Sequence, residues 1–87
     1  MKLNSTFISY TIDGEKILVC LDSKKFAGVI RLNKTAAFIV EQLKTEQDEE
    51  TILAALQSRF SGAEEEEMRR DLAAVITQLS SVGAVDR

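Results

Sequence analysis

The sequence predicts an α+β fold in which a three-stranded antiparallel sheet is followed by three helices. The first part of the chain holds short β-rich runs separated by turn signals, which is typical of sequential strands. Within residues 31–40 the apolar residues then change their spacing to i, i+3, i+4 and i+7, which marks one face of a helix. We therefore expect sheet upstream of this junction and helices downstream of it.

Length and composition indicate one small globular domain over residues 1–87, with 45% hydrophobic residues. No window approaches the ~20 apolar residues of a membrane span, and the first six residues lack the apolar core of a signal peptide. Cys20 is the single cysteine, so no intrachain disulfide can form. These features predict a cytoplasmic protein with no membrane partner.

The charge pattern argues against a nucleic-acid partner and against a metal site. The net charge is −3, and two acidic runs at 46–50 and 64–67 lie where helices should begin, where carboxylates favour the helix dipole. Histidine is absent, and the four glycines stand apart, so no phosphate-binding loop is formed. We therefore expect no enzyme, no metal and no cofactor.

Asp13-Gly14 between two β-rich runs predicts a two-residue type I′ hairpin over residues 7–12 and 15–21. The turn sets the register, with Ile12 opposite Glu15 and each further pair one residue outward. One face of the hairpin then carries Ile8, Tyr10, Ile17 and Val19, and the other carries Phe7, Ser9, Leu18 and Cys20 together with Thr11 and Lys16. We expect the first face to be the core side and the second to be partly solvated.

Residues 22–25 form a polar loop that returns the chain into a third strand, about Phe26 to Leu32. Three sequential strands with short connections form a meander, so the first and third strands should lie at its edges. The outer backbone groups of an edge strand can pair with another strand. This edge is the first feature that points toward a function.

Three helices are expected, at about Asn33 to Leu43, Asp48 to Phe60 and Glu64 to Val82. Asn33 and Asp48 are candidate N-caps, Ser61 and Glu64 have the spacing of a capping box, and Gly83 ends the last helix. The predicted core consists of Ile8, Tyr10, Val19, Leu32, Ile39, Leu43, Ile52, Leu56, Leu72, Val75, Ile76 and Leu79.

Two segments resemble a known family. Leu32-Asn33-x-Thr35-Ala36-Ala37-x-Ile39 is similar to the strand-to-helix signature of PqqD-like proteins. Asp71-x3-Val75-Ile76-x2-Leu79-x3-Gly83-x-Val85 is similar to the last helix of that family and its terminal turn. The resemblance covers about residues 8–85.

The resemblance implies a winged-helix-like peptide chaperone, also called a RiPP recognition element. Such proteins bind the leader segment of a ribosomally made precursor peptide and present the peptide to a modifying enzyme, often a radical SAM protein. The leader adds as a strand to the third β-strand, in a groove shared with the third helix. By resemblance the peptide-binding residues are Phe26, Ala27, Gly28, Val29, Ile30, Arg31, Arg69, Ala73 and Ile76. The same third-strand edge follows from the topology.

Two departures from the family pattern bear on the product of the pathway. Position 40 is Val where the family often has an aromatic residue, and Asp22-Ser23-Lys24-Lys25 stands where the quinone-cofactor branch has a Pro-Glu-Gly loop. A peptide pathway of unknown product is therefore expected instead of pyrroloquinoline quinone synthesis. An acidic leader would suit the cations Lys24, Lys25, Arg31, Arg69 and Arg70.

Other interpretations stay open from the sequence. A winged-helix DNA-binding or regulatory module shares the outline, although four glutamates would open its reading helix. A small structural subunit that binds a folded protein is a further alternative. The third-strand edge also offers a route to a homodimer, and a peptide that uses the same edge would compete with it.

Overall fold

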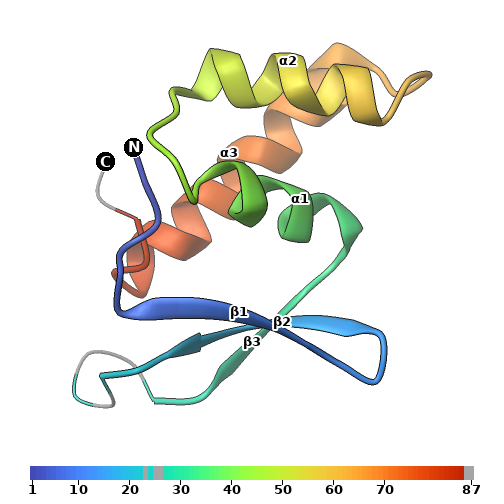
Figure 1. Ribbon diagram of the computed structural model, residues 1–87. Coiled ribbons are helices and arrows are strands. Elements are labelled where there is room, and N and C mark those ends of the chain that lie inside the picture. Colours follow the sequence, from blue (N-terminus) through green and yellow to red (C-terminus); the bar gives the residue numbers. More distant parts are fainter. Residues whose placement is uncertain (23, 25–26, 86–87) are drawn as a thin grey trace.

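The computed structural model describes residues 1–22, 24 and 27–85. Three strands precede three helices, as predicted (Figure 1). The elements are β1 (Phe7–Ile12), β2 (Glu15–Cys20), β3 (Val29–Leu32), α1 (Lys34–Gln42), α2 (Glu49–Arg59) and α3 (Glu65–Ser81). The strands pair antiparallel in the order β1-β2-β3, which leaves β1 and β3 at the edges. All three helices lie on one face of this sheet.

The predicted hairpin register is confirmed. Ile12 faces Glu15 across the turn, and the pairing continues outward to Phe7 opposite Cys20. Asp13 and Gly14 have φ values of 51° and 80°. A type I′ turn requires positive φ at both of these positions, which Gly adopts freely and Asp tolerates.

The third strand is shorter than predicted. β3 begins at Val29, whereas the sequence suggested a start near Phe26. Phe26 lies outside the described residues, and Ala27 and Gly28 precede the strand. Gly28 has a φ of 126°, a conformation that does not continue a regular strand. The strand therefore starts only after this residue.

The helix boundaries agree with the prediction within one residue at each end. The side-chain oxygen of Asn33 accepts a hydrogen bond from the N–H of Ala36 at 2.8 Å, and that of Asp48 accepts one from Thr51 at 2.7 Å. The predicted capping box was wrong. Glu64 is itself the N-cap of α3 and makes no side-chain capping bond. Carboxylates in the first turn of α3 still favour the helix dipole.

The predicted core face of the sheet was also wrong. Phe7, Leu18 and Ile30 are buried beneath the helices, whereas Tyr10 keeps 48% of its surface exposed. The reason is the pairing of β2 with β3, which places Arg31 beside Ile17 and Ile30 beside Leu18. A face that must also carry an arginine is the solvent face. Ile8 and Val19, also expected inside, are only partly buried on that face.

The helical part of the core follows the prediction more closely. The fully buried side chains include Ile39, Leu43, Ile52, Leu56, Ile76 and Leu79. Leu72 is buried as well, while Leu32 and Val75 are partly buried against the core. The chain turns at Gly83 and returns Ala84 and Val85 to the core, where Val85 bridges Leu3.

Within the described part of the chain, none of the helices combines the length and apolar content needed to cross a bilayer.

Candidate functional site

The outer edge of β3 is free. The sheet ends at this strand, and among the residues that the structure describes no segment pairs with its outer side. β3 leads through Asn33, which caps α1, directly into the first helix. The backbone of this edge is therefore held in place by a paired strand on one side and a capped helix at its end.

The register determines which backbone groups point outward. In a two-residue hairpin the pair beside the turn, Ile12 and Glu15, exchanges hydrogen bonds, and bonded and non-bonded pairs then alternate. The bond from Leu21 N to Thr6 O, at 2.6 Å, lies in the same alternation. The odd-numbered residues of β2 therefore bond to β1, and its even-numbered residues bond to β3.

It follows that Ile30 and Leu32, which face Leu18 and Lys16, direct their N–H and C=O groups to β2. Val29 and Arg31 direct theirs to the free edge. Their side chains stand on the outer face of the sheet, where Val29 is 56% exposed. The free edge thus offers two donors and two acceptors at the spacing of an antiparallel or parallel strand.

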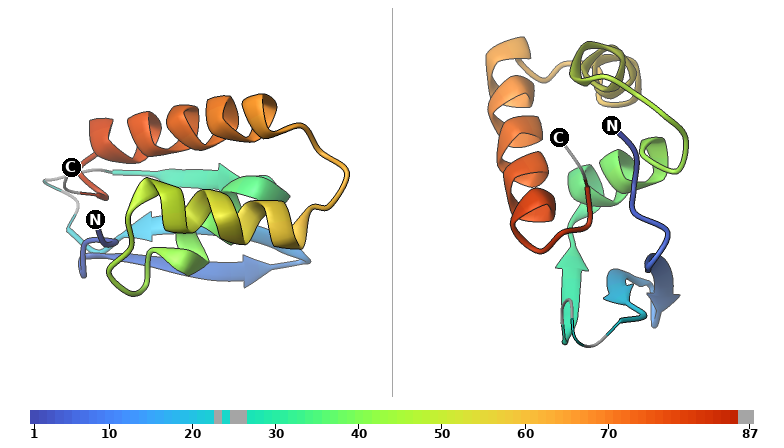
Figure 2. Two further views of the ribbon diagram at one scale, coloured as in Figure 1. Left: turned by 90° about the horizontal axis from the view of Figure 1, so that it is seen from above. Right: turned by 90° about the vertical axis from the view of Figure 1, so that its left-hand side faces the viewer.

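Helix α3 lies beside this edge. In the view onto the sheet, α3 runs outside β3, and the view from the side shows the same helix above and beyond that strand (Figure 2). No helix lies outside β1 at the opposite edge in these views. A strand added to β3 would therefore meet α3 as well as the sheet.

The three predicted residues on α3 have different surroundings in the structure. Ile76 is completely buried in the core, so its side chain is not available to a peptide at the surface. Arg69 lies in the N-terminal part of α3, which packs beside α2, while the C-terminal part approaches the sheet. Its guanidinium contacts Glu50 of α2 at 2.8 Å and Glu65 at 3.8 Å, so it joins the two helices. Ala73 is exposed, as a contact residue must be.

This contact between α2 and α3 is visible in the pKa values of its members. The hydrogen bond and charge of Arg69 lower the pKa of Glu50, and Glu50 in turn raises the pKa of Arg69. The backbone N–H of Thr51 lowers the pKa of Asp48 at the start of α2. All three groups are exposed, so each interaction is screened by solvent.

A cleft of about 970 Å³, absent from the sequence-based prediction, lies at the end of β3. The hairpin turn, the β3–α1 junction and the end of α2 surround it. Phe38 and Phe60 meet edge to face with ring centroids 5.8 Å apart, and the guanidinium of Arg59 lies 5.5 Å from the centre of the Phe60 ring. The volume of this cleft is within the range of ligand sites in proteins.

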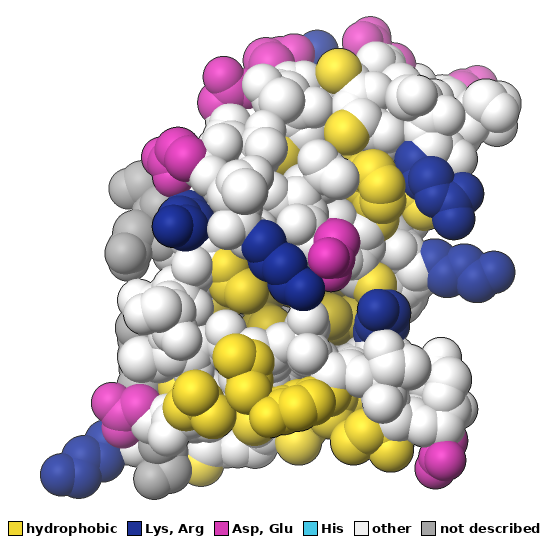
Figure 3. All heavy atoms as spheres, viewed as in Figure 1, with side chains coloured by type: hydrophobic (Ala, Val, Ile, Leu, Met, Phe, Trp, Pro, Cys, Tyr) yellow, Lys and Arg dark blue, Asp and Glu magenta, His cyan; other side chains and the backbone are white. Residues whose placement is uncertain are grey.

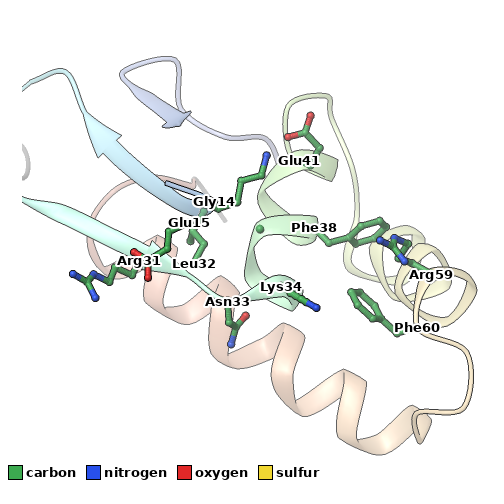
Figure 4. Close-up of a pocket in the computed structure, with 12 residues that line it drawn as sticks. Gly14, Glu15, Arg31, Leu32, Asn33, Lys34, Phe38, Glu41, Arg59 and Phe60 are labelled. Carbon is green, nitrogen blue, oxygen red and sulfur yellow. The ribbon is translucent and has the colours of Figure 1, made fainter. Parts of the chain in front are cut away.

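The charge of this cleft is mainly positive. Lys34 and Arg59 point toward the aromatic pair, whereas the side chain of Arg31 points away from it (Figure 4). Lys16 also lines the cleft, and no ion pair joins Lys16, Lys34 or Arg59 to a carboxylate within the described residues. Of the two lining acids, Glu41 is paired with Lys44 at 3.1 Å.

No cluster of metal-ligating side chains is found within residues 1–22, 24 and 27–85. Phe26 of the predicted peptide-binding residues and Lys25 of the cations expected to suit an acidic leader fall outside the described residues. Sequence reasoning missed the cleft because Phe38 comes from α1, whereas Arg59 and Phe60 come from the end of α2. The change of helix to loop near Phe60 was the available signal.

Two solved structures resemble this chain closely. "TbiB1 in Complex with the TbiA(beta) Leader Peptide" has a TM-score of 0.80 at 22% identity, with 99% of this chain and 95% of that chain covered. "Lasso peptide synthetase B1 complexed with the leader peptide" has a TM-score of 0.74 at 27% identity, with 94% and 92% covered. At such identity the first comparison shows a shared fold.

Comparison of the sequence with protein-family models identifies the family. No curated protein matched the chain. The family described as "Coenzyme PQQ synthesis protein D (PqqD)" matches residues 15–85, from the second strand to the terminal turn. The chain therefore belongs to the PqqD family.

Proposed function

We propose that the protein binds the leader segment of a ribosomally made precursor peptide as an added strand on β3. It presents the peptide to a modifying enzyme, of the radical SAM class or another class, and is itself non-catalytic. The observation that carries this proposal is the free edge of β3 beside α3. Membership of the PqqD family and the likeness to two B1 proteins in complex with leader peptides support it.

The physical basis is strand addition. The backbone groups of Val29 and Arg31 supply hydrogen bonds that any peptide sequence can complete. Alternate side chains of the added strand face the exposed surface of α3, where they supply selectivity. Ala27 and Gly28 extend the contact toward the start of β3, and Ile30 supports the strand from the core side.

The cleft at the end of β3 extends this site. A peptide that leaves the edge beyond Arg31 passes the β3–α1 junction, which forms part of the cleft wall. The cations of the cleft suit an acidic segment of the same peptide, and the Phe38–Phe60 pair suits an apolar side chain within that segment. The expected acidic preference of the leader is thus assigned to Lys16, Lys34 and Arg59 in place of Arg69.

The proposal is tested by measuring binding of synthetic peptides that cover the short reading frames beside the gene. Proline at position 31 removes one outward N–H, and proline is tolerated at a sheet edge where that N–H faces solvent. Arg31→Pro should weaken binding by roughly 2- to 10-fold, the loss expected for one hydrogen bond. Arg31→Ala keeps the N–H and separates this effect from loss of the side chain.

A matched control lies at the other edge. Thr11 of β1 occupies a non-bonded position, so its N–H faces outward as well. Thr11→Pro should leave the affinity unchanged. Equal binding by Arg31→Pro, Thr11→Pro and the parent would contradict strand addition on β3.

A further inference from the structure

The outer face of the sheet is the side away from the helices, and its side chains form rows across the strands. Figure 3 shows hydrophobic side chains gathered over the sheet in the lower part of the molecule. The pairing of the strands gives two complete rows, Ile8–Val19–Val29 and Tyr10–Ile17–Arg31. Each row ends at the free edge of β3, the first in an apolar residue and the second in a cation.

The two residues at the ends of these rows are open to a neighbour. Val29 is 56% exposed, and Arg31 is exposed as well. Directly beside Arg31 on β2 stands Ile17, which is apolar. Within the described part of the chain, no carboxylate forms an ion pair with Arg31. An apolar side chain and an unpaired cation therefore stand side by side along the edge where the peptide is proposed to bind.

A strand added to β3 continues both rows. Residues directly opposite each other in a sheet place their side chains on the same face, and successive residues of a strand alternate between the faces. The peptide residues opposite Val29 and Arg31 therefore stand on the outer face, two positions apart. The residue between them lies opposite Ile30 and faces the helices. Which of the two outer residues comes first depends on the direction of the added strand, but their spacing does not.

We propose that Val29 and Arg31 select leader peptides in which an apolar residue and a carboxylate residue lie two positions apart. The apolar residue extends the Ile8–Val19–Val29 row, and the carboxylate pairs with the guanidinium of Arg31. Each such cross-strand pair changes the affinity by roughly 1.5- to 5-fold. This inference rests on the proposed function and deepens it, because it states which peptides the β3 edge accepts.

A double-mutant cycle between the full chain and selected peptides tests the role of Arg31. The probes are peptides that bind the parent protein, taken from a phage-displayed library of random peptides and then synthesised. Each position of a peptide is replaced in turn by lysine. At one acidic position, lysine should weaken binding to the parent by roughly 3- to 10-fold at low salt, and Arg31→Glu should restore the binding of that peptide.

Val29→Thr tests the apolar half of the pair. Threonine keeps the shape of valine but adds a hydroxyl group to the outer face. The loss of affinity should depend on the peptide residue two positions from the acidic one, and serine at that position should remove it. Ile12→Thr and Arg70→Glu are the matched controls, since they make the same chemical changes away from the β3 edge. Neither control should couple to any single position of the peptide.

The remaining outcomes overturn the proposal. Equal effects of Arg31→Glu and Arg70→Glu on every peptide would assign the effect to net charge. Couplings at adjacent positions, or at none, would show that the outer face does not select the peptide. Circular dichroism melts of each variant exclude misfolding as the cause.

The same peptides separate this proposal from the proposed function. Peptides that Arg31→Pro weakens more than Arg31→Ala, but that show no coupling to Val29 or Arg31, leave strand addition standing and remove only the outer-face selection. A library that yields no peptide able to bind the parent contradicts both.

Discussion

The two edges of the sheet present the same kind of backbone groups in different surroundings. On β1, Ser9 and Thr11 direct their N–H groups outward, and on β3 Val29 and Arg31 do so. Within the described residues, α3 lies beside the β3 edge and no helix lies outside β1, and β3 leads directly into the wall of the basic cleft. An added strand gains side-chain contacts on β3 that β1 does not offer. The surroundings of an edge, more than its unpaired backbone N–H and C=O groups, decide where a peptide binds.

The largest expected effect separates the two sides of β3 itself. Ile30 directs its N–H to β2 and its side chain to the core, so Ile30→Pro breaks the inner ladder. We expect a loss of about 3–5 kcal/mol in the free energy of unfolding, enough to unfold much of a small domain. Arg31→Pro should lose about 1 kcal/mol or less. Chemical denaturation measures both, and equal losses would show that the assigned direction of the N–H groups is wrong.

A second comparison concerns the two faces at neighbouring positions of β2. Leu18 is fully buried beneath the helices, whereas Val19 is only partly buried on the outer face. Leu18→Ala should reduce the free energy of unfolding by about 2–4 kcal/mol, and Val19→Ala by about 1 kcal/mol or less. Urea denaturation distinguishes them. A larger loss at Val19 would restore the face that the hairpin sequence suggested.

The third prediction tests whether the cleft at the end of β3 contributes to binding. Lys34→Gln with Arg59→Gln removes two cations and retains residues that favour a helix. An acidic peptide should bind roughly 3- to 10-fold more weakly to this variant at low salt, and the difference should shrink as salt screens the charges.

The control for this variant removes the same charge elsewhere. Lys2→Gln with Arg70→Gln lies outside the cleft and keeps the Glu41–Lys44 pair, so it should have little effect on binding. If both double variants lose the same affinity, net charge is responsible and the cleft has no specific role.

The smallest effect concerns two carboxylates at the start of α2: Asp48, which caps the helix, and Glu50, which contacts Arg69 of α3. Asp48 and Glu50 have lowered pKa values in the folded protein, so the unfolded chain binds more protons in acid. Their stabilisation is complete above the ordinary carboxyl pKa and is lost as the pH falls through the lowered values. The melting temperature should therefore decrease by a few degrees below about pH 4.

Substitution identifies the groups responsible for this acid sensitivity. Asp48→Asn keeps an N-capping oxygen without a titrating charge, so it should flatten the decrease. Arg69→Gln should flatten it further by removing the partner of Glu50. A parent and variants with the same dependence on pH would assign the acid sensitivity to other carboxylates.

Local signals in the sequence predicted most of the fold. Asp13-Gly14 determined the hairpin register, and Asn33 and Asp48 marked two helix starts, because turns and caps depend on neighbouring residues only. The core face of the sheet could not be predicted in this way. It depends on the register of β2 with β3, which no tight turn determines.

For the candidate site, the sequence predicted the edge strand but not the groups that face its free side. The meander identified β3 as an edge, but the direction of its N–H groups required the register. Arg69 fell on the predicted flank of α3, yet its position beside α2 follows from the packing of two helices. The cleft joins residues from the hairpin, α1 and α2, and such a site is visible only in three dimensions.

Amide hydrogen exchange by NMR, with and without a binding peptide, tests strand addition most directly. The peptide should protect the N–H groups of Val29 and Arg31, which face the free edge, and leave those of Ser9 and Thr11 on β1 unchanged. Ile30 is already bonded to β2 and should change less. Protection at Ser9 and Thr11, or at neither pair, would contradict the binding of the peptide as a strand on β3.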